Sequence, residues 1–83
     1  MSWKVIIDKP ARKFIARQNP DQQKRILTAI YKLPAEGDIA PLRGTPGRYR
    51  LRVGTYRVLY DLHNDILTVA VIKVDNRGDV YKG

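Results

Sequence analysis

The spacing of apolar residues in the first part of the chain predicts a strand followed by a helix. Residues 3–7 form a short apolar run rich in β-branched side chains, which is typical of a strand. The spacing then becomes helical, because one apolar face recurs at i, i+3 and i+4 and comprises Ala11, Phe14 and Ile15. Pro10 suits the first turn of this helix. The helix should end near Asn19, since a residue that precedes proline avoids the helical region.

A second helix is predicted to begin immediately afterwards. Asn19 is a good N-cap, Pro20 fits the first helical position, and Gln22 follows the cap by three residues, where it can complete a capping box. Helical spacing then gives the buried stripe, formed by Ile26, Leu27, Ile30, Tyr31 and Leu33. We therefore expect two short helices in a hairpin.

The second half of the chain changes to strand-like alternation. Residues 34–47 contain three prolines and three glycines and are expected to be irregular. Three predicted strands follow, at residues 48–53, 56–62 and 66–74, and the last is apolar on both faces, as in a central strand covered on both sides. The order β-α-α-β-β-β predicts an α+β fold: a mostly antiparallel sheet with the helical hairpin packed on one face, in a single domain over residues 1–83.

The turn between the first two of these strands fixes which side chains share a face. Gly54-Thr55 fits a two-residue type II′ turn, which pairs Val53 with Tyr56. One face then carries Arg52 opposite Arg57, Arg50 opposite Leu59 and Arg48 opposite Asp61, the only nearby carboxylate expected there. The other face collects apolar and aromatic residues: Tyr49, Leu51, Val53, Tyr56, Val58 and Tyr60. A slip of one residue would mix the two sets, so the pattern itself selects this register.

Charge indicates what the arginine-bearing face could bind. The 83 residues include 16 Lys plus Arg against 8 Asp plus Glu, a net charge of +8, which favours a polyanionic partner. Residues 42–60 hold five arginines and no Asp or Glu. An ordinary solvated strand face would show the same alternation, but the planar guanidinium is well suited to phosphate.

Other features narrow the class of protein. There is no cysteine, which excludes disulfides and thiolate chemistry and fits a reducing compartment. No apolar run approaches the length of a membrane span and the first residues do not resemble a signal peptide, so we expect a cytoplasmic protein without a membrane partner. His63 is expected in an exposed turn. Because motifs for hydrolytic triads, zinc proteases, P-loops and dinucleotide binding are missing, no metal or cofactor is expected.

Three segments together resemble a known family. They are Leu42-Arg43-Gly44, residues 48–60 (RYRLRVGTYRVLY) and residues 75–81 (DNRGDVY). In order and spacing they are similar to the RelE/ParE superfamily of toxins from type II toxin-antitoxin systems, and to its RelE branch in particular. The resemblance implies a toxin that enters the ribosomal A site and cleaves mRNA through attack by a 2′-hydroxyl, and that a cognate RelB-like antitoxin holds inactive.

The resemblance also implies roles for individual residues. Arg50 and Arg52 match two basic positions of one strand, where well-known members carry lysine that is proposed to act in general-base catalysis. Arg57 and Arg77 would clamp the scissile phosphate, Arg77 would protonate the leaving 5′-oxygen, and Tyr81 would orient the neighbouring base. Because arginine holds its proton too tightly to be an ordinary base, Arg52 is assigned to electrostatic stabilisation and the base stays unnamed. Further RNA contacts are expected from Arg43 and Arg48.

Two alternatives share this fold or this charge. A ParE-type toxin poisons DNA gyrase and is a binding protein, which would not need Arg77 and Tyr81 at their RelE spacing. A non-catalytic RNA- or ribosome-binding module, or a degenerate toxin that binds only its antitoxin, would keep the basic face without the cleavage. Activity separates these alternatives.

Overall fold

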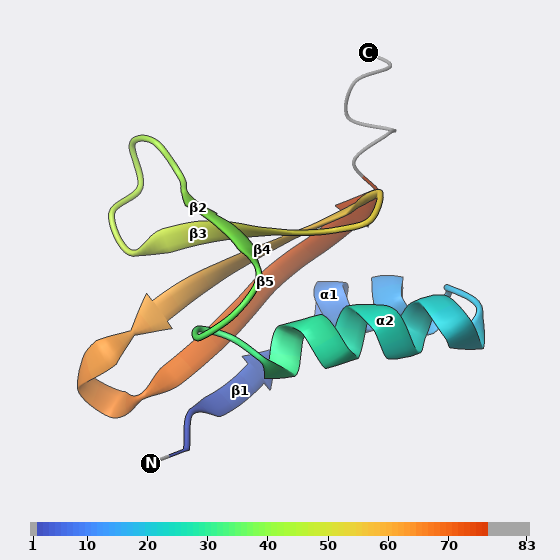
Figure 1. The fold of residues 1–83 in the computed structure, drawn as a ribbon, viewed down its shortest axis with the longest axis horizontal. Coiled ribbons are helices and arrows are strands. Elements are labelled where there is room, and N and C mark those ends of the chain that lie inside the picture. Colours follow the sequence, from blue (N-terminus) through green and yellow to red (C-terminus); the bar gives the residue numbers. More distant parts are fainter. Residues whose placement is uncertain (1, 77–83) are drawn as a thin grey trace.

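The computed structural model describes residues 2–76 and shows the predicted α+β fold with one additional strand (Figure 1). Arg77 and Tyr81 lie outside the described residues. The elements in chain order are β1 (Lys4–Ile7), α1 (Lys9–Ala16), α2 (Pro20–Tyr31), β2 (Asp38–Pro41), β3 (Arg48–Val53), β4 (Tyr56–His63), a 3₁₀ turn (Asn64–Ile66) and β5 (Thr68–Asn76). Among these residues no helix is long and apolar enough to cross a membrane.

The junction between the helices has the predicted cap. The side chain of Asn19 accepts a hydrogen bond of 2.9 Å from the backbone N–H of Gln22, and Pro20 occupies the first turn of α2. Tyr31 is an exception to the predicted stripe, because its side chain is 63% exposed. It follows Ile30 by one residue, so it lies about 100° around a helix of 3.6 residues per turn from the face that Ile26 and Ile30 bury.

Within residues 2–76 the sheet has five strands in the order β1-β5-β4-β3-β2, with β1 parallel to β5 and the other pairs antiparallel. Both helices lie on the same side of the twisted sheet (Figure 1). The core forms between them, and it comprises Ala11, Ile15, Ile26, Ile30 and Leu33 against Leu51, Val53, Tyr56, Val58, Tyr60, Val69, Val71 and Val74. The opposite side of the sheet carries the arginines.

The β3-β4 hairpin has the predicted register. Arg52 pairs with Arg57, Arg50 with Leu59, and Arg48 with Asp61. Gly54 has a φ of +58°, as the first central position of a type II′ turn requires, and Thr55 keeps a negative φ. The binary pattern of residues 48–62 was therefore sufficient to define this part of the sheet.

The expectation that residues 34–47 are irregular is wrong for one segment. Residues 38–41 form β2, which pairs with β3 and places Asp38 opposite Arg52. The free edge of β3 has backbone groups that need partners, and a short edge strand satisfies them. Pro41 is compatible with this strand because an edge position does not need every N–H group.

The last strand also differs from its prediction. It begins at Thr68, because Asn64–Ile66 form a 3₁₀ turn and Leu67 adopts a left-handed φ of 47°. Leu59 pairs with Lys73 while Tyr60 pairs with Val71, so Ile72 is an extra residue that makes a β-bulge. The bulge reverses the alternation of side chains along β5. Only one face of this strand is fully covered, since Lys73 is exposed on the other.

Candidate functional site

The sheet face opposite the helices carries a row of four charged residues, one from each of four neighbouring strands. Asp38 of β2 pairs with Arg52 of β3, Arg52 pairs with Arg57 of β4, and Arg57 pairs with Asp75 of β5. Side chains of directly paired residues lie on the same face of a sheet. The row therefore places two arginines side by side between two carboxylates.

Each arginine of the row contacts the carboxylate on its outer side. Nη2 of Arg57 lies 3.3 Å from Oδ2 of Asp75, whereas Nη1 of Arg52 lies 3.9 Å from Oδ2 of Asp38. Nζ of Lys73 lies 3.8 Å from the same Asp75 oxygen. These contacts correct the expectation that Asp61 is the only nearby carboxylate on this face, which instead carries Asp38, Asp61 and Asp75. β2 supplies Asp38, and the bulge in β5 places Asp75 on this side.

The arginines at positions 50, 52 and 57, here called the arginine cluster, keep buried donors without acceptors. Arg50 lies next to Arg52 on the same face of β3 and makes no ion pair with any described residue. Nη1 of Arg50, Nε of Arg52 and Nε of Arg57 are buried and find no hydrogen-bond partner among residues 2–76. Buried polar groups are normally hydrogen-bonded, and exceptions often mark a binding function. Three neighbouring guanidinium groups with unfilled donors suit a phosphate oxyanion.

Arg48 differs from the arginine cluster because its guanidinium already donates hydrogen bonds to a carboxylate. Its Nε donates to Oδ1 of Asp61 at 2.8 Å and its Nη2 to Oδ2 at 3.2 Å. These hydrogen bonds hold the pKa of Asp61 below its ordinary value and raise the pKa of Arg48. Arg43 is exposed in the loop that joins β2 to β3. The structure thus brings Arg50, Arg52 and Arg57 together, and leaves Arg48 and Arg43 farther along the surface.

The layer beneath the arginine cluster is packed tightly enough to fix it in place. Leu51 and Val58 are fully buried on the inner face, and the rings of Tyr49 and Tyr60 stack with centroids 5.7 Å apart. Burial, with a smaller contribution from Tyr49, raises the pKa of Tyr60 to about 12. The arginines therefore project from a rigid sheet rather than from a loop, which favours accurate placement of a bound phosphate.

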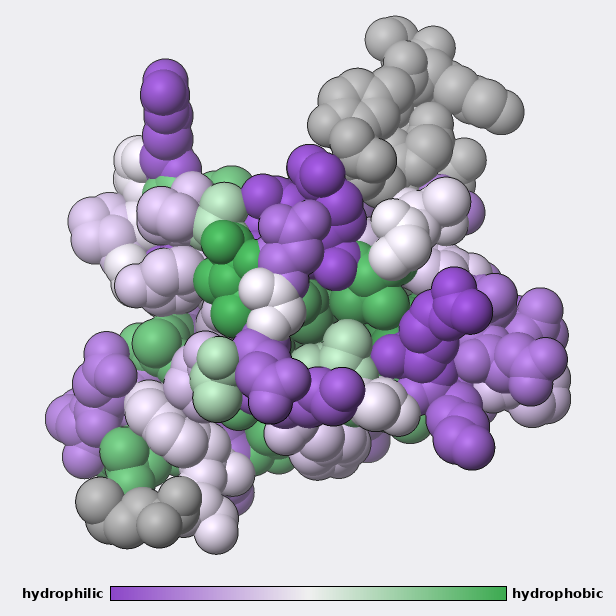
Figure 2. Space-filling model, in the orientation of Figure 1, coloured by the Kyte–Doolittle hydropathy of each residue, from purple (hydrophilic) through white to green (hydrophobic). Residues whose placement is uncertain are grey.

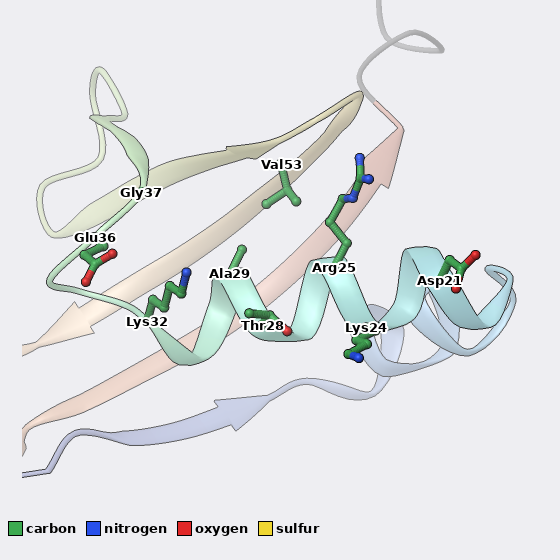
Figure 3. Close-up of a pocket in the computed structure, with 9 residues that line it drawn as sticks. All are labelled: Asp21, Lys24, Arg25, Thr28, Ala29, Lys32, Glu36, Gly37 and Val53. Carbon is green, nitrogen blue, oxygen red and sulfur yellow. The ribbon is translucent and has the colours of Figure 1, made fainter.

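A hollow on the helix side of the molecule is an alternative candidate for a binding site. It has a volume of about 520 Å³ and lies between α2 and the sheet, with apolar surface in its depth and hydrophilic side chains around it (Figures 2 and 3). Ala29 and Val53 contribute apolar surface there, and Lys24, Arg25 and Lys32 are its cationic residues. None of the residues predicted for function lines it. It also lacks the unfilled buried donors of the arginine cluster, so we place the candidate site on the sheet face.

The described part of the chain offers little evidence for a metal site or for a histidine in the candidate site. No group of three or more His, Asp or Glu residues there could hold a metal ion. His63 is exposed at the end of β4, where it pairs with Thr68 at the start of β5, far along the strand from Arg57.

Comparison with known proteins agrees with the fold and with the resemblance of the sequence motifs. Residues 9–81 match the family described as ParE toxin of type II toxin-antitoxin system, parDE. Toxin RelG of Mycobacterium tuberculosis is 40% identical over 67 residues, which span 70% of this chain and 76% of that toxin.

Solved structures of RelE toxins superpose over almost the whole chain. In the RelBE2 toxin-antitoxin complex from Mycobacterium tuberculosis, the matching chain gives a TM-score of 0.78 at 26% identity, with 93% of this chain and 100% of that chain covered. The archaeal RelE-RelB complex from Pyrococcus horikoshii OT3 gives 0.76 at 29% identity, with 94% and 98% covered. The chain therefore belongs to the ParE toxin family of type II toxin-antitoxin systems, and its fold is that of the RelE toxins.

Proposed function

We propose that this toxin is a ribosome-dependent endoribonuclease that cleaves mRNA in the A site. The observation that carries the proposal is the arginine cluster on a rigid sheet face, whose three buried donors lack acceptors in the described part of the chain. A scissile phosphodiester would supply the missing acceptors. The fold of RelE toxins and the identity with RelG support the same reading.

The chemistry would use the nucleophile that RNA itself contains. The 2′-hydroxyl attacks the adjacent phosphorus, a dianionic phosphorane develops, and the 5′-oxygen leaves, giving a 2′,3′-cyclic phosphate and a 5′-hydroxyl. Preorganised cations stabilise this charge strongly in a partly desolvated site. Arg52 and Arg57, adjacent in one row of the sheet, would contact the non-bridging oxygens, and Arg50 would hold the neighbouring phosphate.

Residues beyond the described part of the chain would complete the site. Arg77 follows β5 directly, and we assign to it the second half of the phosphate clamp and the protonation of the leaving oxygen. Tyr81 would orient the base next to the cut. Arg43 and Arg48, on the surface around the arginine cluster, would contact flanking RNA.

We also propose that a RelB-like antitoxin inhibits this toxin by covering the basic sheet face or displacing the segment that carries Arg77. Several of the similar structures are complexes of RelE with RelB. A net charge of +8 favours an acidic or amphipathic partner that folds on binding.

A second candidate function is inhibition of DNA gyrase, because the matching family is described as ParE toxin. A translating extract and a gyrase supercoiling assay together distinguish the two functions. In a translating extract, the RelE-type function predicts new mRNA 5′ ends in phase with the reading frame. Loss of gyrase supercoiling activity without such ends would favour the ParE-type function and contradict our proposal.

The role of Arg77 gives the sharpest check on the catalytic assignment. Arg77→Ala should lower the single-turnover cleavage rate by about 10²-fold or more and change ribosome affinity little, since the lost contact belongs to the transition state. Arg48→Ala is the matched comparison, because it removes one arginine from the same surface and should mainly weaken binding. Equal rate losses would mean that the basic surface acts only as an electrostatic anchor.

A further inference from the structure

The proposed cleavage needs a group that removes the proton of the 2′-hydroxyl, and the arginine cluster does not provide one. The arginine guanidinium is already protonated at neutral pH, so neither Arg50 nor Arg52 has a free lone pair with which to act as a base. His63 lies at the other end of β4 from Arg57. The remaining candidates among the described residues are the carboxylates of the same sheet face.

Two of these carboxylates are already engaged. Both oxygens of Asp61 accept hydrogen bonds from Arg48, which holds its pKa low and makes it a weak base. Asp75 has one oxygen that contacts Arg57 and Lys73, and its other oxygen is buried, with the side chain only 19% exposed. Its two ion pairs, with Arg57 and with Lys73, therefore give Asp75 a role in holding cations.

The third carboxylate is open to a ligand. The side chain of Asp38 is 60% exposed, and its contact with Arg52, at 3.9 Å, is too long for a hydrogen bond. Asp38 lies at the edge of the sheet, in the same row as Arg52 and Arg57. We infer that Asp38 is the general base of this toxin, an inference that rests on the proposed ribonuclease function.

The positions of Asp38, Arg52 and Arg57 in one row across the sheet are suited to this role of Asp38. Neighbouring strands lie about 4.8 Å apart, so a phosphate held across Arg52 and Arg57 has Asp38 one strand beyond Arg52. In-line displacement places the attacking and leaving oxygens on opposite sides of phosphorus. With the 2′-hydroxyl directed toward β2, the leaving oxygen points toward β5, the strand that Arg77 follows.

The step balances without any further reactant. A carboxylate oxygen of Asp38 accepts the proton of the 2′-hydroxyl while the bond from O2′ to phosphorus forms. The bond from phosphorus to O5′ breaks, and O5′ takes a proton either from water or from Arg77, which then regains a proton from water. Asp38 then returns its proton to solvent, and the products are the 2′,3′-cyclic phosphate and the 5′-hydroxyl.

The test uses the full-length toxin, programmed ribosomes and a synthetic mRNA in single turnover. Asp38→Asn should lower the cleavage rate by about 10²- to 10⁴-fold, the usual contribution of general acid–base catalysis. It also removes a negative charge next to Arg52, so ribosome affinity should stay equal or increase. A role for Asp38 in folding or in ribosome binding would instead lower stability or affinity together with the rate.

A substrate with sulfur in place of the scissile O5′ separates the base from the acid. Thiolate leaves without protonation, so this mRNA should restore the part of the Arg77→Ala rate loss that is due to missing protonation, but should not restore cleavage by Asp38→Asn. Asp65→Asn is the matched control, because Asp65 is an exposed carboxylate in the 3₁₀ turn and should keep the wild-type rate. Asp38→Asn at the wild-type rate, or its rescue by the thio substrate, would overturn the inference.

The wild-type toxin distinguishes this inference from the function on which it rests. If it fails to cleave ribosome-bound mRNA, or cleaves mRNA with a 2′-deoxy nucleotide at the cut, the proposed function itself is wrong. If it cleaves normally and only Asp75→Asn removes activity at full ribosome affinity, the function stands and the base is not Asp38.

Discussion

Arg52 and Arg57 face each other across the β3-β4 ladder, and this pairing should make the site less stable than a neutral pair would. Replacing Arg52 with glutamine removes one of two like charges and keeps most of the side-chain stem. We expect Arg52→Gln to raise the free energy of unfolding while it lowers cleavage. The two effects have opposite signs because phosphate binding requires a concentration of positive charge that folding alone does not favour.

The size of the stability change follows from three local contributions. Like charges directly opposite each other in a sheet destabilise it by up to about 1 kcal/mol. A buried donor without a partner, such as Nε of Arg52, costs about 1 kcal/mol or more, reduced here because the side chain is 38% exposed. The loose contact with Asp38 returns only a few tenths of a kcal/mol. The net gain should be about 0.5–1.5 kcal/mol, which corresponds to roughly 2–12 °C in Tm for a domain of this size.

Urea unfolding at low and high salt tests this reasoning. The gain should shrink at 1 M salt, where the Debye length falls to about 3 Å and screens the repulsion. Arg43→Gln is the control for stability, since Arg43 is exposed in a loop and its replacement should leave the unfolding free energy within about 0.5 kcal/mol of wild type. A loss of stability in Arg52→Gln, or a gain that salt does not change, would refute the argument.

Three further predictions concern stability. The pKa of Asp61 is lower in the folded state than its ordinary value of about 4. The stability from its pair with Arg48 is therefore present above that pH and is lost as the pH falls below it. When the unfolding free energy from urea titrations is plotted against pH, Asp61→Asn should make the decrease at acid pH smaller. The pKa of Tyr60 is raised to about 12, so stability should fall as the pH rises from about 10 through 12, and Tyr60→Phe should reduce this loss in the same assay. Asn19→Ala removes the hydrogen bond to Gln22 and should cost about 1 kcal/mol of unfolding free energy, whereas Asn19→Ser should keep most of it.

Strong local signals in the sequence were enough to predict the hairpin and the helices. In the hairpin, alternation and a glycine turn agree on one register, and every pair from Arg48–Asp61 to Val53–Tyr56 follows. The cap at Asn19 is a similar local signal. Such features are determined by residues close together in the chain, so they can be found without knowledge of the tertiary structure.

The features that the sequence did not show depend on distant partners. β2 is short, ends in proline and lies in a segment rich in glycine and proline, so only the free edge of β3 makes it a strand. The bulge at Ile72 gives only a weak signal in the sequence, because the buried residues Val71 and Val74 are three positions apart, whereas regular alternation would place them two apart. Missing these two features removed Asp38 and Asp75 from the predicted site.

The parallel pairing of β1 with β5 also affects how the molecule is assembled during synthesis. Lys4 aligns with Thr68, so the first strand has no partner in the sheet until the last one has been made. Contacts between residues so far apart in sequence slow folding, whereas the helical hairpin and the β3-β4 hairpin can form early from local contacts. A nascent chain therefore carries Arg52 and Arg57 before it has Asp75 or the valines of β5 that complete the core. The finished arginine site should arise late, in one cooperative closure, only after residue 76 has left the ribosome that makes it.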